Sequence, residues 1–211
     1  MIYTIHGFAG RTSQFDFITT EKVDIDLFEL KEFSLAAIEA KIDFSKEVKL
    51  IGYSLGARLA AQIFLRNADS ISQCLLLAGH MGLSSEEDKK NRIDIESNFK
   101  DKLRHLSQEE FISFWNSLEL FSHDHSERIR YEPALLFKMI EQFALTKQPY
   151  LIPSLAAYKE KIHFFYGEKD TKYFQYAQSE LSDFNVHTFA DAGHRVYQYE
   201  SVKNKILEVL Q

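Results

Sequence analysis

The sequence is poor in the residues and segments that would place a protein outside a reducing compartment. Its single cysteine, Cys74, excludes an intramolecular disulfide and lies in an apolar run, where we expect a small buried residue. No apolar run approaches the roughly 20 residues of a membrane span, and segment 2–5 follows no basic leader region. We therefore expect a cytoplasmic protein that does not insert into membranes.

Basic residues are also too scattered for a surface that binds nucleic acid. The 25 lysines and arginines are outnumbered by 31 acidic residues, which gives a net charge of -6, and the basic residues form no run. The histidines are not spaced as metal ligands, so we expect neither metal nor cofactor. A small anionic substrate stays compatible with this charge, because a few arginines in one pocket can reverse the local potential.

All three prolines fall in one stretch of the chain, which also differs in its secondary-structure pattern. Residues 82–158 show helical patterns without a convincing strand, whereas strand-like and helix-like segments alternate on either side. We therefore predict one α/β core formed by residues 1–81 and 159–211, with residues 82–158 inserted as a helical lid. The expected strands are 2–5, 23–27, the run entering Ser54, 73–78, 161–167 and 186–189; the expected core helices are 33–42, the segment from Leu55, 173–181 and 202–210.

A Gly-x-Ser-x-Gly pattern at Gly52, Ser54 and Gly56 joins a short apolar run to a helix-forming segment. A sharp strand–turn–helix brings strand and helix so close that only glycine fits two residues before and after the serine. The turn gives the serine a positive φ and holds its hydroxyl clear of the backbone. Ser54 is therefore the candidate reactive residue, and an ordinary turn between strand and helix is the alternative.

A reactive serine needs a neighbouring base, and the base needs an acid that orients it. His194 follows the last expected strand and Asp170 follows the strand before it. The order Ser54, Asp170, His194 is typical of residues at successive strand ends in such a sheet. Asp191 is the weaker candidate for the acid, because it lies only three residues from His194 on the same loop.

The loop His6-Gly7-Phe8 follows the first strand, at the sheet edge where sites form. The backbone N–H groups of Phe8 and Leu55 are the expected donors to an oxyanion. Together these motifs resemble the α/β-hydrolase superfamily, which implies a mostly parallel sheet of about six strands, helices on both faces and an inserted helical lid. The hairpin that normally precedes the first strand is missing, which leaves a sheet edge either exposed or covered by a second subunit. A monomer and a homodimer are both compatible with that edge.

Three local motifs resemble one family more narrowly, that of MenH, the 2-succinyl-6-hydroxy-2,4-cyclohexadiene-1-carboxylate synthases of menaquinone biosynthesis. They are the stretch Gly-Tyr-Ser-Leu-Gly-Ala-Arg that ends at Arg58, the stretch 82–92, and the tryptophan-containing segment 114–121. Taken singly, an arginine in such a stretch is more often a solvated residue, whereas a tryptophan is about as often a substrate wall as an apolar anchor. The resemblance implies that the substrate-binding residues are Tyr53, Arg58, Arg92 and Trp115. Ala57 departs from the family's glycine and would place a methyl group near the pocket.

The MenH family eliminates pyruvate from 2-succinyl-5-enolpyruvyl-6-hydroxy-3-cyclohexene-1-carboxylate after abstracting a proton. Arginine suits such a small polycarboxylate, because its guanidinium pairs with carboxylates in a planar, bidentate way. The resemblance implies that Ser54 is the base, that His194 relays the proton and that Asp170 orients His194. Two alternatives stay open: a carboxylesterase or thioesterase that forms an acyl-enzyme on Ser54, and a non-catalytic binding module. A complete serine, histidine and aspartate set argues against the binding module.

Overall fold

The computed structural model describes residues 1–211 and contains one six-stranded sheet in the order β2-β1-β3-β4-β5-β6. Every neighbouring pair of strands is parallel. The predicted α/β class with about six parallel strands is confirmed, and all six predicted strands are present with ends that differ by one or two residues. The strands are β1 (Ile2–Ile5), β2 (Lys22–Ile25), β3 (Val48–Tyr53), β4 (Ile71–Leu77), β5 (Ile162–Gly167) and β6 (Asn185–Phe189).

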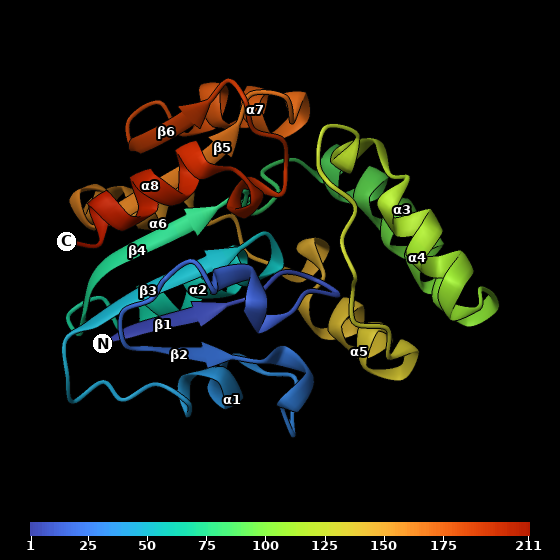
Figure 1. The fold of residues 1–211 in the computed structure, drawn as a ribbon, viewed down its shortest axis with the longest axis horizontal. Coiled ribbons are helices and arrows are strands. Elements are labelled where there is room, and N and C mark those ends of the chain that lie inside the picture. Colours follow the sequence, from blue (N-terminus) through green and yellow to red (C-terminus); the bar gives the residue numbers. More distant parts are fainter.

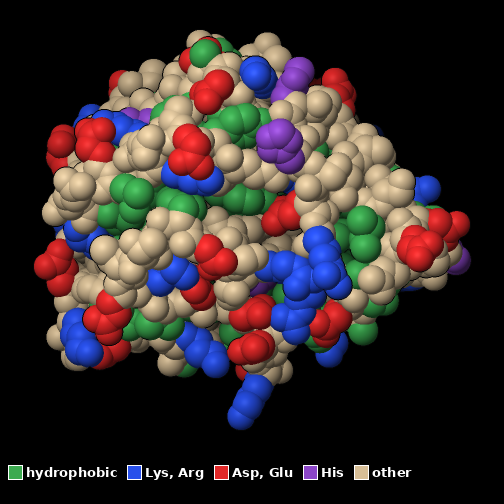
Figure 2. All heavy atoms as spheres, viewed as in Figure 1, with side chains coloured by type: hydrophobic (Ala, Val, Ile, Leu, Met, Phe, Trp, Pro, Cys, Tyr) green, Lys and Arg blue, Asp and Glu red, His purple; other side chains and the backbone are tan.

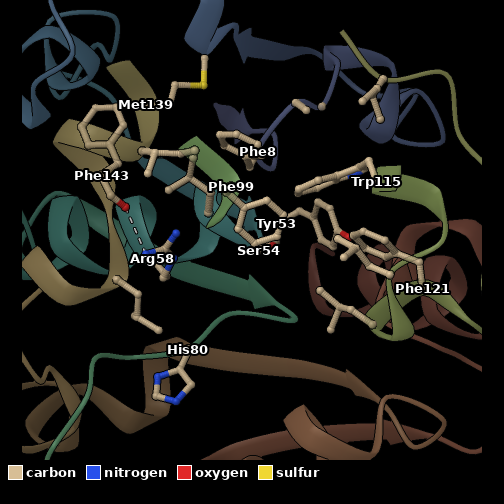
Figure 3. A pocket seen from close by; sticks show the side chains of 18 of the residues that line it. Phe8, Tyr53, Ser54, Arg58, His80, Phe99, Trp115, Phe121, Met139 and Phe143 are labelled. Carbon is tan, nitrogen blue, oxygen red and sulfur yellow. Dashed lines mark hydrogen bonds between the residues drawn. The ribbon is translucent and has the colours of Figure 1, made fainter. Parts of the chain in front are cut away.

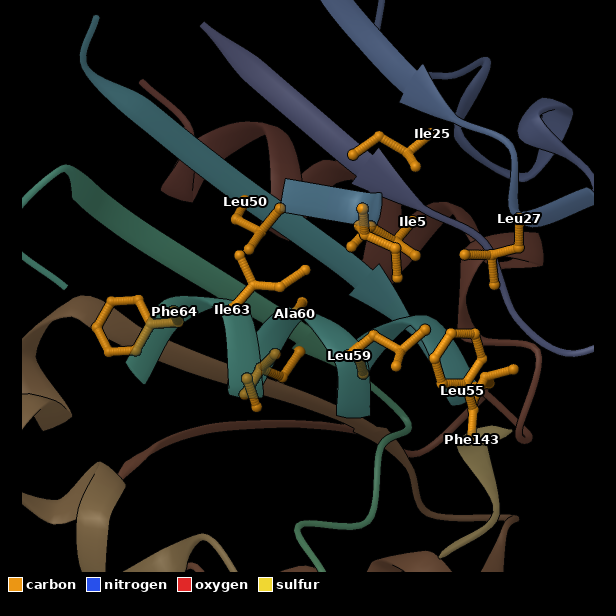
Figure 4. Close-up of a cluster of buried hydrophobic side chains, with 14 of the residues drawn as sticks. Ile5, Ile25, Leu27, Leu50, Leu55, Leu59, Ala60, Ile63, Phe64 and Phe143 are labelled. Carbon is orange, nitrogen blue, oxygen red and sulfur yellow. The ribbon is translucent and has the colours of Figure 1, made fainter. Parts of the chain in front are cut away.

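The central strands are buried on both faces, which explains why they appear in the sequence as continuous apolar runs. Along β4, Cys74 and Leu76 belong to one hydrophobic cluster, whereas Leu75 and Leu77 belong to the other. The first cluster packs under α1 (Leu35–Glu39), α2 (Leu55–Arg66) and α7 (Thr171–Glu180). The second packs against α8 (Glu200–Val209) and the 3-10 turn Thr12–Phe15. Figure 4 shows α2 lying along the sheet, with Leu59 and Ile63 directed into the first cluster.

Helix α1 is shorter than the predicted helix 33–42. The Ser34 hydroxyl accepts a hydrogen bond from the Ala37 N–H at 3.2 Å and so starts the helix. The chain leaves the helix after Ala40, and the Asp43 N–H donates to the Tyr3 hydroxyl at 2.9 Å. The tertiary contact with β1 therefore ends the helix before its apolar pattern does.

The segment between β4 and β5 contains only helices and turns, and most of it lies beyond the carboxyl ends of the strands (Figure 1). Serine caps begin its first two helices: Ser85 accepts from the Asp88 N–H, and Ser107 forms a capping box with Glu110. Pro133 stands at the first position of the third. The helices are α3 (Glu86–His105), α4 (Gln108–Asn116), α5 (Pro133–Phe143) and α6 (Ile152–Leu155). The last of these returns to the core, where α6 packs against α2.

Strand β2 forms one edge of the sheet, as its two aspartates predicted. Asp24 accepts hydrogen bonds there from Thr4 and Lys22, so charged and polar side chains occupy this edge. Figure 2 shows acidic and basic side chains interspersed over one face of the molecule. None of the helices is both long enough and apolar enough to cross a membrane.

Candidate active site

Ser54 lies at the sharp turn between β3 and α2 with φ 51° and ψ −109°. The positive φ predicted for this serine is confirmed. A Cβ atom on Gly56 would overlap the carbonyl oxygen of Ile5, and one on Gly52 would overlap the carbonyl oxygen of Gly56. The two glycines are therefore required by the close approach of α2 to the sheet.

The structure brings together the side chains of Ser54, Asp170 and His194, the three residues that their order along the chain had suggested. His194 Nε2 lies 3.2 Å from Ser54 Oγ, and His194 Nδ1 lies 2.6 Å from Asp170 Oδ2. Because the carboxylate accepts from an Nδ1 proton, Nε2 is left as the acceptor for the serine hydroxyl. Asp170 also caps α7 by accepting from the Tyr173 N–H. Asp191 lies on the surface and accepts from the Ser201 hydroxyl at 2.9 Å instead.

Three aromatic rings surround the imidazole of His194, which is 1% exposed. Their centroids lie 4.7 Å away for Tyr173, 5.7 Å for Tyr53 and 5.7 Å for Phe121. This packing, together with the carboxylate of Asp170, holds the ring in one orientation. Removal from water also strengthens the electrostatic contacts between these groups.

Two backbone N–H groups are free to face a developing oxyanion. The Phe8 N–H has no acceptor among the backbone and side-chain hydrogen bonds of the loop. Leu55 is the first residue of α2, so no helical carbonyl precedes its N–H. His6 fixes the loop before Phe8, because its Nε2 accepts from the Leu27 N–H at 2.9 Å and its Nδ1 donates to the Gly7 carbonyl at 2.8 Å.

A pocket of roughly 1000 Å³, including its open mouth, lies in front of Ser54. It contains every predicted substrate-binding residue, although Tyr53 is largely buried beneath the His194 ring. In Figure 3, Arg58 and His80 lie on one side of Ser54, and Trp115 and Phe121 lie on the other. The pocket therefore has a basic side and an aromatic side.

Arg58 reaches the basic side from α2 and has no carboxylate partner. Its Nη1 donates to the Phe143 carbonyl at 3.2 Å. Arg92 comes from α3 and pairs with Glu96 at 3.0 Å, while Glu96 also accepts from the Leu145 N–H at 2.9 Å. Burial, and then the positive charge of Arg92, lower the pKa of Arg58 to about 10, so it stays charged at neutral pH. Glu96 opposes this shift through its charge but makes no ion pair with Arg58. A half-buried guanidinium that no carboxylate contacts favours an anionic ligand.

His80 also lines the pocket, and we did not predict it from the sequence. Burial, followed by the charges of Arg58 and Arg92, lowers its pKa to about 4, so the ring is neutral at pH 7. Its Nδ1 is buried without a hydrogen-bond partner, and its ring stacks on Tyr176 at 4.0 Å. The available signal was its position just beyond the carboxyl end of β4, the sheet edge that also carries Ser54.

The methyl group of Ala57 does not line the pocket. It is fully buried, and a Cβ atom on Gly79 would come within 2.6 Å of it. The alanine therefore packs against the end of β4 and leaves the pocket unchanged. No group of three or more histidine, cysteine, aspartate or glutamate side chains in the structure is arranged to hold a metal ion.

Known proteins resemble the chain in sequence and in fold, although no family model matches it. It is 28% identical over 157 residues to the 2-succinyl-6-hydroxy-2,4-cyclohexadiene-1-carboxylate synthase of Enterobacter sp. (strain 638). The aligned residues cover 71% of this chain and 60% of that protein. The enzyme of the same name from Yersinia enterocolitica is 27% identical over 163 residues, covering 72% and 58%. The chain thus spans about three fifths of the length of these relatives.

Solved structures of other proteins superpose on the chain over nearly its whole length. MenH from S. aureus superposes with a TM-score of 0.87 at 20% identity, over 99% of this chain and 92% of that one. The naproxen esterase of Bacillus subtilis superposes with a TM-score of 0.60 at 14% identity, over 100% and 83%. The chain therefore has the α/β-hydrolase fold, and the resemblance to MenH that its motifs predicted is confirmed.

Proposed function

We propose that this chain eliminates pyruvate from 2-succinyl-5-enolpyruvyl-6-hydroxy-3-cyclohexene-1-carboxylate to give 2-succinyl-6-hydroxy-2,4-cyclohexadiene-1-carboxylate. One observation carries the proposal: Arg58, which has no carboxylate partner, shares a pocket with Arg92 and Ser54. The substrate has several carboxylates, and a guanidinium that is not already paired can bind one of them with charge-assisted hydrogen bonds. A simple ester would leave this half-buried cation without an anionic partner.

The proposed reaction begins with the proton on ring carbon 2, which is acidic because it lies next to the succinyl ketone. Ser54 takes this proton while passing its own hydroxyl proton to His194 Nε2, and Asp170 stabilises the imidazolium. The ring double bond then moves from carbons 3 and 4 to carbons 4 and 5, a new one forms between carbons 2 and 3, and enolpyruvate leaves carbon 5. The leaving group takes up the proton held by His194 and becomes pyruvate, which restores the neutral residues.

Negative charge develops on the succinyl ketone oxygen during proton abstraction. The free N–H groups of Phe8 and Leu55 suit this oxygen, because preorganised donors stabilise charge that develops in the transition state. The aromatic side of the pocket, with Trp115 and Phe121, suits the ring carbons, and Tyr53 supports it from beneath the His194 ring. We also propose that residues 82–158 act as the lid, since they bring Arg92 and Trp115 to the pocket.

A carboxylesterase or thioesterase is the second candidate function. The distance of 3.2 Å between Ser54 and His194, together with the two free N–H groups, would equally serve an acyl-enzyme. The two functions differ in whether the arginines bind the substrate and in whether Ser54 becomes acylated. A lyase that uses Ser54 as a base never acylates it, whereas an esterase does so in every cycle.

Arginine variants separate the two functions. Arg58→Met and Arg92→Met should each remove a charge-assisted contact of roughly 1.5–3 kcal/mol, which lowers kcat/KM for the menaquinone precursor about ten- to a hundredfold. Turnover of p-nitrophenyl acetate should hardly change. Arg66→Met is the matched control, because Arg66 lies on the same helix as Arg58 but pairs with Glu39 on the surface.

Intact-mass spectrometry during turnover tests the role of Ser54 directly. With the precursor as substrate, the lyase leaves the serine unmodified. An acyl adduct that disappears in Ser54→Ala, together with an ester turnover that is insensitive to both arginines, would refute the lyase and leave the esterase.

A further inference from the structure

Arg195 directly follows His194 and is an arginine buried almost completely, with 1% of its surface exposed. Its guanidinium donates from Nη1 to the His125 carbonyl and from Nη2 to Asn116 Oδ1, both at 2.8 Å. Its Nε lies 3.6 Å from Glu127 Oε2. All three partners belong to the segment 116–127, which we call the strap.

The strap is also attached to the chain on either side of Arg195. Asp124 accepts from the Arg195 N–H at 3.0 Å and from the Tyr199 hydroxyl at 3.0 Å. A Cβ atom on Gly193 would overlap the carboxylate of Asp124, so the strap and the His194 loop are in close contact there. Further along, the His125 N–H donates to Gln198 Oε1 at 2.9 Å. The strap is therefore fastened along the whole loop that carries His194.

Phe121 connects this attachment to the triad. The Arg195 guanidinium carbon lies 4.0 Å from the centroid of the Phe121 ring, and the His194 ring lies 5.7 Å from the same ring. Phe121 also packs against Trp115 at 5.4 Å, and both rings line the pocket. The Phe121 side chain thus holds the aromatic wall of the pocket and the His194 ring in a fixed relation.

If this buried position served only to fill space in the core, an apolar side chain would suit it better than an arginine. Burying a guanidinium is unfavourable unless its donors are paired, and an apolar side chain of similar volume often stabilises such a site equally well. The directional donors of arginine can join three separate points, which an apolar side chain cannot do. The three hydrogen-bonded and ionic contacts of Arg195 therefore indicate that the residue fixes the position of neighbouring groups and does not mainly stabilise the fold.

We propose that Arg195 is a positioning residue: it locks the strap to the His194 loop, so that His194 keeps its orientation toward Ser54 while the rest of the lid moves. The kinetic part of this inference rests on the proposed function, and the structural part does not. Arg195 also lines the pocket, but its guanidinium is already engaged by His125, Asn116 and Glu127, so in this proposal it acts through His194 and Phe121 and not by binding the substrate's carboxylates.

Hydrogen–deuterium exchange of Arg195→Met tests the lock. We expect exchange in residues 116–127 to accelerate about tenfold or more, which corresponds to roughly 1.4 kcal/mol of lost protection, while peptides from β3 and α2 keep wild-type rates. Arg104→Met is the control. The Arg104 guanidinium also lies over a phenylalanine ring, that of Phe137, but Arg104 belongs to α3 and does not contact the strap. Wild-type protection of the strap in Arg195→Met would overturn the inference.

Steady-state kinetics distinguish positioning from substrate binding. Misplacement of His194 should lower kcat about ten- to a hundredfold with KM changed less than about twofold. A raised KM with unchanged kcat would show that Arg195 binds substrate and would overturn the positioning role. If the wild type releases no pyruvate, the proposed function fails, and the exchange result still decides whether the lock exists.

Two further variants keep the test decisive if Arg195→Met does not fold. Asn116→Ala and Asp124→Ala each remove one partner on the strap and leave the buried arginine in place. Both should accelerate exchange in the same peptides, by less than the arginine variant. Wild-type protection in both would overturn the lock.

Discussion

Ser54 is held in a backbone conformation that its side chain disfavours. Its φ of 51° is imposed by the turn between β3 and α2, and such conformations cost about 1–3 kcal/mol. We predict that Ser54→Gly unfolds at a higher temperature than Ser54→Ala, by about 2–4 °C for each kcal/mol of strain that is relieved. Both variants lack the hydroxyl, so their difference in differential scanning calorimetry does not depend on its loss.

The control for this comparison is Ala60→Gly, in the middle of α2. There glycine should destabilise by more than the helical backbone effect of about 0.5–1 kcal/mol, because the substitution also removes a fully buried methyl group. An equal or lower melting temperature for Ser54→Gly than for Ser54→Ala would show that the turn stores no strain.

The triad residues act together, so their substitutions should not add. Ser54→Ala, His194→Gln and Asp170→Asn should each lower kcat by about a thousandfold or more, and a double variant should be little worse than a single one. Asp191→Asn, on the surface beside Ser201, should keep wild-type activity. A large loss in Asp191→Asn with activity retained in Asp170→Asn would reverse the choice of acid.

The residues that could be predicted are those whose chemistry shows in local patterns. Ser54 stands in a five-residue motif. Asp170 and His194 each follow a strand that the alternation of strand-like and helix-like segments predicts, so their positions could be predicted as well. Arg195 and His80 could not be found in this way. Their roles depend on contacts across the fold, such as that between Arg195 and Asn116, which lie 79 residues apart.

Strands β5 and β6 are joined through a pair of histidines. The His163 and His187 rings stack at 5.5 Å, with Nδ1 of the first 3.3 Å from Nε2 of the second. Burial, followed by the charge of His163, lowers the pKa of His187 to about 4, and burial followed by Lys205 lowers the pKa of His163. Glu208 opposes this shift at His187 only in part. The pair is therefore neutral in the folded protein at neutral pH.

This pair should make the protein less stable in mild acid. The unfolded chain binds protons near pH 6.5, whereas His187 in the folded state does so only near pH 4, so stability is lost as the pH falls through this window. In His187→Gln the drop in melting temperature between pH 7.5 and 4.5 should be smaller by about 2–4 °C, because solvent screening limits the effect to roughly 1 kcal/mol. His105→Gln, on the surface, should behave as the wild type. An equal drop in all three proteins would contradict the assignment.

Elements were predicted well where burial alone determines them and less well where a tertiary contact ends them. The central strands appear in the sequence as apolar runs because both of their faces are covered. The helices α3 and α4, which the helical pattern of residues 82–158 indicated, begin at the serine caps Ser85 and Ser107. Helix α1 ends early because Asp43 reaches Tyr3, a contact that no local pattern announces.

At the scale of the whole molecule, the pocket is shared between two parts of the chain. The sheet supplies Ser54, Asp170 and His194 at the carboxyl ends of β3, β5 and β6. The helical segment supplies Arg92 and Trp115. The molecule has a net charge of -6, but both parts direct an arginine into one partly buried site, which supports the proposal of a polycarboxylate substrate.

The most direct test of the proposed lyase is pyruvate release from 2-succinyl-5-enolpyruvyl-6-hydroxy-3-cyclohexene-1-carboxylate, followed through lactate dehydrogenase. We predict one pyruvate for each precursor consumed by the wild type, and at least about a thousandfold slower release by Ser54→Ala. Release that is no faster than the spontaneous reaction without protein, or release by Ser54→Ala at the wild-type rate, would contradict the account.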